Sequence, residues 1–161
     1  MFDNHFAAHM KMFRSLAVIV VAAAIFNLTS CGSDPAPEKS PQDQQLEKLS
    51  KTWKMTSVTQ DGNAPQDPYT GFQLGITSTA GQTTFSYTTT GRPTGTFSPW
   101  GPSGTFTFGS DFATTLTRDD GTTITYAVSA TQLQMTFTYS GAGYQTRAGV
   151  FTGNWVFTFG L

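Results

Sequence analysis

The chain of 161 residues has little of the chemistry on which most enzymes and nucleic-acid-binding proteins depend. It contains one cysteine and two histidines, and 12% of its residues are charged, where about 25% is typical. Its formal net charge is −1, so it has no surplus of basic side chains for binding nucleic acid. A disordered chain would also carry more charge. The composition therefore favours a folded domain of low charge that does not bind nucleic acid.

An unbroken apolar run near the N-terminus, LAVIVVAAAIF over residues 16–26, follows two basic residues. A run of this length is too short to span a bilayer comfortably and is typical of a secretory signal peptide. It is followed by LTSC at residues 28–31, which resembles the bacterial lipobox. In lipoproteins with that motif, the cysteine is acylated and becomes the new N-terminus after cleavage. We therefore predict a signal peptide over residues 1–30 and lipid attachment at Cys31.

Acylation would tether the protein to a membrane without a transmembrane segment. Residues 31–45 are rich in proline and polar side chains and show no apolar periodicity, so we expect a flexible linker there. Gly32, directly after the cysteine, is not the acidic residue associated with inner-membrane retention. The predicted location is the cell envelope, anchored to the outer membrane and facing either the periplasm or the exterior.

Loss of the signal peptide would leave a chain without histidine or free thiol, because His5 and His9 are removed and Cys31 is acylated. This excludes Ser-His-Asp and Cys-His catalysis and the usual zinc and copper sites. Asp61 and the pair at residues 119–120 occupy turn positions that aspartate takes for backbone reasons. No spacing of the remaining acids supports a pair of catalytic carboxylates. We therefore expect no enzymatic activity, no cofactor and no metal.

Threonine, phenylalanine and glycine are what the sequence has in abundance, with 28, 14 and 16 residues. β-Branched and aromatic side chains suit a pleated, half-buried surface. After one expected helical turn at residues 46–49, apolar residues alternate with Thr, Ser, Gln or Gly in runs bounded by turn residues. These runs cover residues 53–58, 72–76, 85–87, 106–108, 124–128, 133–139 and 155–159. They predict an all-β domain over residues 46–161. An antiparallel up-and-down barrel of about eight to ten strands is expected, with a β-sandwich as the alternative.

The first and last of these runs resemble a known family. Residues 49–62, LSKTWKMTSVTQDG, are similar to the opening strand of bacterial (Bacteroidota-type) lipocalin-like lipoprotein domains, and residues 153–159, GNWVFTF, are similar to their final strand. The lipocalin signature Gly-x-Trp is matched at Trp53, whereas Lys51 stands in place of the glycine. The resemblance implies an eight-stranded barrel in which an arginine packs over that tryptophan, with Arg147 as the candidate. It also implies a family some of whose members are suspected of binding small apolar molecules or glycans.

The candidate ligand-binding residues are aromatic and basic side chains in the predicted connections, namely Trp100, Arg92 and Tyr144. Trp100 lies between two prolines in SPWGP, where it can stack on a sugar or close the mouth of a barrel. The simpler interpretation is that its ring folds back over the apolar end of the barrel. We predict a lipid-anchored envelope protein that binds a small apolar molecule or a glycan. The alternative is a structural or accessory subunit of an outer-membrane or surface complex, without a small ligand.

Overall fold

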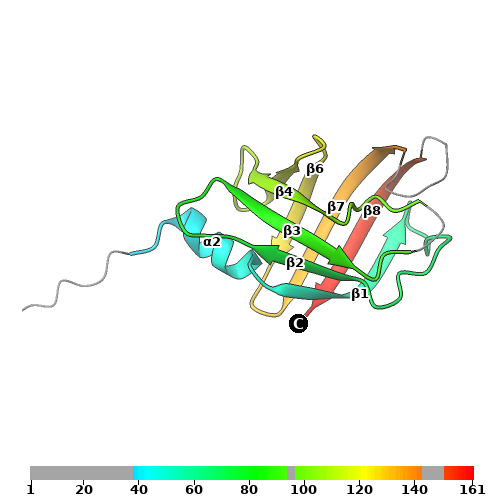
Figure 1. Cartoon of the computed structure of the whole chain (residues 1–161), viewed down its shortest axis with the longest axis horizontal. Helices are drawn as coiled ribbons and strands as arrows, with labels where there is room; N and C mark the ends of the chain where they lie inside the picture. Colours follow the sequence, from blue (N-terminus) through cyan, green and yellow to red (C-terminus); the bar gives the residue numbers. More distant parts are fainter. Residues whose placement is uncertain (1–37, 94–96, 143–150) are drawn as a thin grey trace, which may run out of the picture. The chain divides into compact units, whose positions relative to one another are not determined.

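The computed structural model describes residues 38–93, 97–142 and 151–161. Within them, helix α2 (Pro41–Leu49) precedes eight strands: β1 (Thr52–Gln60), β2 (Gln73–Thr77), β3 (Thr84–Thr90), β4 (Ser103–Phe108), β5 (Thr115–Arg118), β6 (Thr123–Val128), β7 (Gln132–Gly141) and β8 (Phe151–Gly160). Each strand pairs antiparallel with the next, and β8 pairs with β1 (Figure 1). The sheet is thus a closed up-and-down barrel. This confirms the predicted lipocalin-like barrel over the sandwich.

The strands bury one face because apolar side chains stand at every second position. Strand β7 shows this most clearly, since Leu133, Met135, Phe137 and Tyr139 are buried and the residues between them are exposed. Strands β3 and β6 follow the same alternation. The buried side chains of all eight strands converge in the interior and form the core. Residues 39–161 are one compact unit with this core at its centre.

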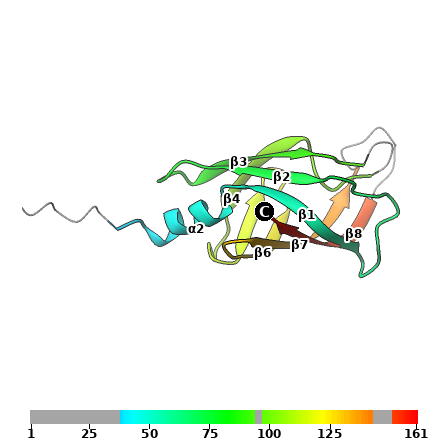
Figure 2. The ribbon, with the colours of Figure 1, turned by 90° about the horizontal axis from the view of Figure 1, so that it is seen from below.

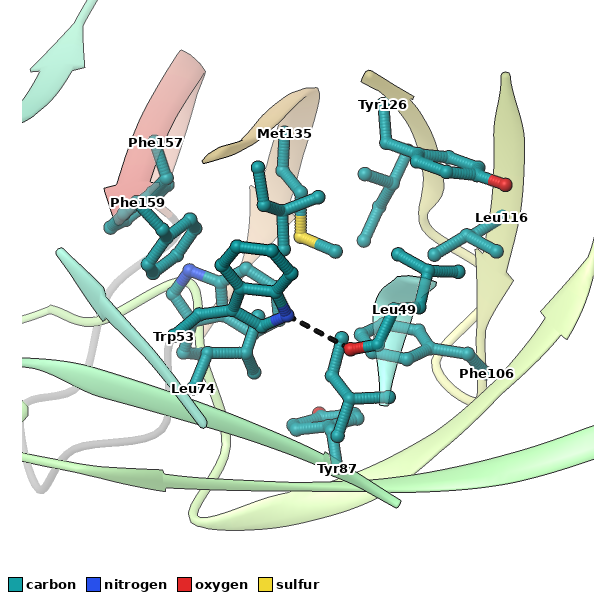
Figure 3. Close-up of a cluster of buried hydrophobic side chains, with 14 of the residues drawn as sticks. Leu49, Trp53, Leu74, Tyr87, Phe106, Leu116, Tyr126, Met135, Phe157 and Phe159 are labelled. Atoms are coloured by element: carbon teal, nitrogen blue, oxygen red, sulfur yellow. Dashed lines mark hydrogen bonds between the residues drawn. The ribbon is translucent and has the colours of Figure 1, made fainter. Parts of the chain in front are cut away.

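Helix α2 closes one end of the barrel (Figures 1 and 2). Its Leu46 and Leu49 are buried in the core, and the Trp53 indole Nε1 donates to the Leu49 carbonyl at 2.9 Å (Figure 3). Three side chains of this segment form hydrogen bonds with the neighbouring connections. The Asp43 carboxylate accepts from the Gly81 amide, the Gln45 side-chain amide donates to the Ala113 carbonyl, and the Lys51 ammonium donates to the Ala130 carbonyl. We call this end the closed end. No helix in the described ranges has the length and apolarity needed to cross a membrane.

Helix α2 begins earlier than the sequence suggested. Residues 41–45, expected as part of the linker, form its first half. The Ser40 hydroxyl accepts a hydrogen bond from the Asp43 amide at 3.1 Å, and Pro41 fits the first turn because its missing N–H has no intrahelical partner to lose. The capping residues therefore start a helix in a segment whose composition is that of a linker.

The opposite end, which we call the open end, is bounded by the β1–β2 connection (residues 61–72) and the described parts of the β3–β4 connection (residues 91–93 and 97–102). Glycines bring these two connections together. Gly91 has φ +66°, and a Cβ built there would lie 2.4 Å from the Gly71 carbonyl oxygen. Only glycine allows this approach, since any side chain would overlap the neighbouring backbone. The two connections therefore meet in a close backbone contact at the open end.

Candidate ligand-binding site

A hollow of about 290 Å³ lies at the open end, between the two connections that meet at Gly91. It is lined by Asp67, Pro68, Thr70, Gly91, Arg92 and Pro93. A narrower hollow of about 90 Å³ shares Asp67 with it and is lined by Tyr69, Phe97 and Trp155 among others. One guanidinium, one carboxylate and one hydroxyl thus border a common space. Such a set can hydrogen-bond a small polar molecule, and the proline rings offer it apolar surface.

Arg92, one of the predicted candidates, lines this hollow. Among the described residues, the hydrogen bond found for its side chain runs from Nη1 to the Trp100 carbonyl at a long 3.4 Å. A guanidinium carries five N–H donors in a planar fork, so Arg92 retains further donors for a ligand. Asp67 lines the same hollow as Arg92, and the fold brings the two residues there through the contact between the connections. Nothing in the residue pattern indicates that neighbourhood.

Tyr69 forms the buried side of the narrower hollow, and 4% of its surface is exposed. Burial raises the pKa of its hydroxyl well above the ordinary value. The neighbouring Ser98 side chain acts in the opposite direction, while the negative charge of Asp67 adds to the rise and the positive charge of Arg92 reduces it. The Tyr69 hydroxyl is therefore a neutral donor and acceptor at physiological pH. Its ring packs edge-on against Trp155 at 6.0 Å between centroids.

Trp100 lies in a connection, as predicted, but its indole is inside the barrel and 0% of it is exposed. It contacts five aromatic side chains of the interior and the guanidinium of Arg118. The structure thus brings Arg92 together with the backbone of Trp100 and not with its ring, so the ring does not line the open-end hollow. The other two predicted positions, Tyr144 and Cys31, lie outside the described residues.

Arg118 is a buried cation that the sequence reasoning missed. Its side chain is fully buried, and its Nε and Nη2 donate to the two carboxylate oxygens of Asp120 at 3.0 and 2.7 Å. Its Cζ lies 5.1 Å from the centroid of Trp100 and 5.4 Å from that of Phe137. Arg147, the cation that the family resemblance assigns to Trp53, is outside the described residues. The cation found over Trp53 is Lys51, with Nζ 5.4 Å from the ring centroid.

The closed end has a hollow of its own, about 320 Å³, beside helix α2. Its charged groups already serve the fold, because Lys39 pairs with Glu47 at 2.7 Å and Asp43 accepts from the Gly81 amide. The open-end hollow is therefore the better candidate for a ligand. Within the described ranges, no three His, Cys, Asp or Glu side chains gather where they could hold a metal ion.

Comparison of the chain with protein-family models, with curated proteins and with solved structures gave no match.

Proposed function

We propose that the protein is a lipid-anchored, lipocalin-like protein of the cell envelope that binds a small polar ligand, such as a mono- or disaccharide, at its open end. The observation that carries the proposal is the hollow between the two connections, where Arg92, Asp67 and Thr70 border one space. Its volume of about 290 Å³ is near the lower end of the range for ligand sites, about 300–1,000 Å³. Hydroxyl-rich molecules match a surface that offers both donors and acceptors.

The filled interior favours a polar ligand over an apolar one. Trp53, Trp100 and Trp155 are buried within the barrel. The Phe157 ring contacts both Trp100 and Trp155, and the Phe72 ring also contacts Trp100. An apolar molecule would have to displace these side chains, since close-packed interiors leave few voids. A docking role through an apolar patch has less support, because Leu161 is the large apolar side chain found exposed among the described residues.

The proposed anchor is the lipobox-like cysteine, and its test is metabolic labelling with a palmitate analogue. Wild-type protein should carry the label and Cys31→Ala should lose it. Helix α2 starts at Pro41, ten residues after Cys31, and enters the barrel at its closed end. Label that persists in Cys31→Ala would overturn the anchoring proposal and leave the ligand proposal standing.

Ligand binding is tested by titrating the purified domain with neutral saccharides and, separately, with a long-chain fatty acid, followed by amide chemical shifts. Saccharide should shift residues of the two connections. Arg92→Gln should weaken its binding about tenfold, since a hydrogen bond to a charged group contributes about 1.5–3 kcal/mol. The matched control is Lys54→Gln, which removes the same charge from an exposed position on β1 and should bind like wild type.

Two outcomes would contradict the ligand proposal. Fatty-acid binding with shifts confined to inward-facing strand residues would replace the polar ligand with an apolar one. No binding of any saccharide, combined with recovery of the wild-type protein in a stable envelope complex, would favour the accessory-subunit function.

A further inference from the structure

The Tyr69 side chain is packed against three aromatic rings at the wall of the narrower open-end hollow. Its ring is 4% exposed, and the three neighbouring centroids lie 5.3 to 6.0 Å from its own, in edge-on geometry. These rings belong to Phe72, Trp155 and Phe157. Packing on three sides restricts the orientation of Tyr69, so a ligand that binds its hydroxyl has little side-chain entropy to remove.

The hydroxyl of Tyr69 has no hydrogen bond within the described part of the chain. It is buried, and no donor or acceptor there meets it in hydrogen-bonding geometry. The hydroxyl of its neighbour Ser98 accepts from the Trp100 amide at 3.2 Å instead. Most buried polar groups in folded proteins have a partner, because an unmet donor or acceptor opposes burial. A hydroxyl at the wall of a hollow can obtain its partner from the molecule that occupies the hollow.

The Tyr69 hydroxyl lies close to the charged residues of the open end. Burial is the main reason that its pKa is raised, and the charges of Asp67 and Arg92 also act on it, in opposite directions. Both of these residues line the wider hollow, and Asp67 lines the narrower one as well. The two hollows are therefore adjacent at Asp67. A single molecule can lie in the wider hollow and extend a short arm toward Tyr69.

The size and the walls of the narrower hollow indicate what this arm is. Its volume is about 90 Å³, against about 290 Å³ for the wider hollow, so it accommodates a substituent of a few atoms beside a ring held in the wider one. The rings of Phe97 and Trp155 also line it and offer apolar surface. A hydroxymethyl group matches both features, because its CH₂ contacts the rings and its hydroxyl meets that of Tyr69.

The charge of Asp67 excludes an acidic arm. Asp67 is half-buried and lines both hollows, so a carboxylate that entered the narrower hollow would meet a like charge at short range. A neutral hydroxyl has no such penalty, since it can donate to the Asp67 carboxylate or to the Tyr69 oxygen. An uncharged arm is therefore favoured over a carboxylate of the same length.

We propose that the Tyr69 hydroxyl recognises the primary hydroxyl of a neutral hexopyranoside whose ring lies in the wider hollow. The inference rests on the proposed function and names the class of saccharide that the same site selects. Tyr69 is then a specificity-determining residue. Hexosides bind more tightly than 6-deoxyhexosides and pentosides, which lack the primary hydroxyl, and more tightly than hexuronosides, which carry a carboxylate in its place.

The test removes the same hydrogen bond from either side, by changing the protein or the ligand. Because residues 39–161 form a compact unit with its own core, the chain from Gly32 onward is used without acyl groups, as wild type and Tyr69→Phe. Methyl D-glucopyranoside, methyl D-galactopyranoside and their 6-deoxy analogues are titrated and followed by amide chemical shifts. Tyr69→Phe should weaken binding of the methyl hexoside about three- to tenfold, as expected for a hydrogen bond between neutral groups.

Binding of the 6-deoxy analogue should differ by less than about twofold between the two proteins, because the bond is already absent. The matched control is Tyr126→Phe, which removes a buried hydroxyl at the closed end and should leave both affinities unchanged. Tyr69→Phe should unfold at the same urea concentration as wild type or a higher one, since its hydroxyl has no partner to lose.

The outcomes separate this inference from the proposed function. Equal loss of hexoside and 6-deoxyhexoside affinity in Tyr69→Phe would refute the role of Tyr69 and leave saccharide binding at the open end in place. Tighter binding of the methyl pentoside or hexuronoside than of the hexoside would do the same. Absence of binding by every saccharide would overturn both proposals. Where Tyr69→Phe does not fold, the preference of the wild type for the hexoside over its 6-deoxy analogue decides the question.

Discussion

The pair formed by Arg118 and Asp120 offers a sharp test of how the barrel tolerates a buried charge. In the variant Asp120→Asn, the fully buried guanidinium loses the carboxylate that accepts from its Nε and Nη2. Breaking a buried ion pair costs about 3–5 kcal/mol, and the cost here should be nearer 2–3 kcal/mol because 25% of the Asp120 side chain is exposed. For a domain of this size, that corresponds to a fall in Tm of about 8–12 °C.

The assay is urea denaturation at pH 7 with Asp119→Asn as the matched control. Asp119 lies in the same turn and accepts from the Thr105 amide, which an asparagine oxygen can replace. Both variants remove one negative charge, but only Asp120→Asn strands the guanidinium. The double variant Arg118→Met with Asp120→Asn should recover stability relative to Asp120→Asn alone. Equal stability of the two single variants, within about 0.5 kcal/mol, would refute the assignment of Asp120 as the essential partner.

The pH dependence gives the same prediction a second measurement. Burial raises the pKa of Asp120, but hydrogen bonds from Arg118 and Thr122 and the guanidinium charge outweigh it and hold the pKa well below its usual range. A carboxyl whose pKa is lowered in the folded state contributes stability above its unfolded value of about 3.9, and this is lost as the pH falls through the folded value. The gap between wild type and Asp120→Asn should therefore be constant near neutral pH and narrow below about pH 4. A gap that widens on acidification would contradict the argument.

Three further predictions concern the two ends of the barrel. Ser40→Ala removes the cap of α2 and should lower the free energy of unfolding by about 1 kcal/mol in urea titrations. Gly91→Ala should destabilise the protein by about 1–3 kcal/mol and abolish saccharide binding at the open end, because its Cβ would overlap the Gly71 backbone at a positive φ. Burial raises the pKa of Tyr126 to about 12, so its contribution to stability is present below pH 10 and is lost between pH 10 and 12. Tyr126→Phe should remove this component of alkaline unfolding.

The barrel could be predicted because its signal is local. Alternation of period two assigns each strand residue to the core or the solvent without knowledge of its neighbours, and β7 follows it over its full length. The turn at residues 119–122 joins β5 to β6 as its Asp-Asp-Gly sequence indicates. Closure of the barrel cannot be predicted from the alternation of apolar and polar residues. It follows from the ten-residue register between β7 and β8 and from the pairing of β8 with β1.

The start of α2 was not predicted because the composition of residues 41–45 indicates a linker, whereas the capping residues indicate a helix. Residues 41–45 contain no aliphatic or aromatic side chain to mark a helical face, so their composition predicts a linker. Its helical signals are the Ser40 cap, Pro41 in the first turn and the acidic Asp43. The first half of α2 is stabilised by capping side chains and by hydrogen bonds to distant connections. The Gln45 side-chain amide, for example, donates to the Ala113 carbonyl and to the Tyr126 hydroxyl.

The alternation on β5 also predicts that the Arg118 side chain faces the core, although the number of charged residues does not indicate a buried charge. Leu116 faces the core on β5, so Arg118, two residues later, must also face it. A cation directed inward requires a partner, and Asp120 follows two residues further on. The sequence therefore contained the buried pair.

The interior position of Trp100 could not be predicted from alternation, because residues in a connection show no regular pattern of apolar and polar side chains. Space inside the barrel decides it. Gly104 pairs with Tyr87 across β3 and β4, and a Cβ there would lie 2.6 Å from the Asp119 carboxylate and 2.7 Å from the Tyr87 ring and hydroxyl. The missing side chain lets the Tyr87 ring come close to the Gly104 backbone, and the ring stacks on Phe106 at 4.6 Å between centroids. Trp100 then packs edge-on against Tyr87, so the two aromatic positions and the glycine form one three-dimensional arrangement that no single segment of sequence specifies. In ¹⁹F spectra of protein labelled with 5-fluorotryptophan, Gly104→Ala should therefore shift the Trp100 resonance, although Gly104 and Trp100 lie on different elements.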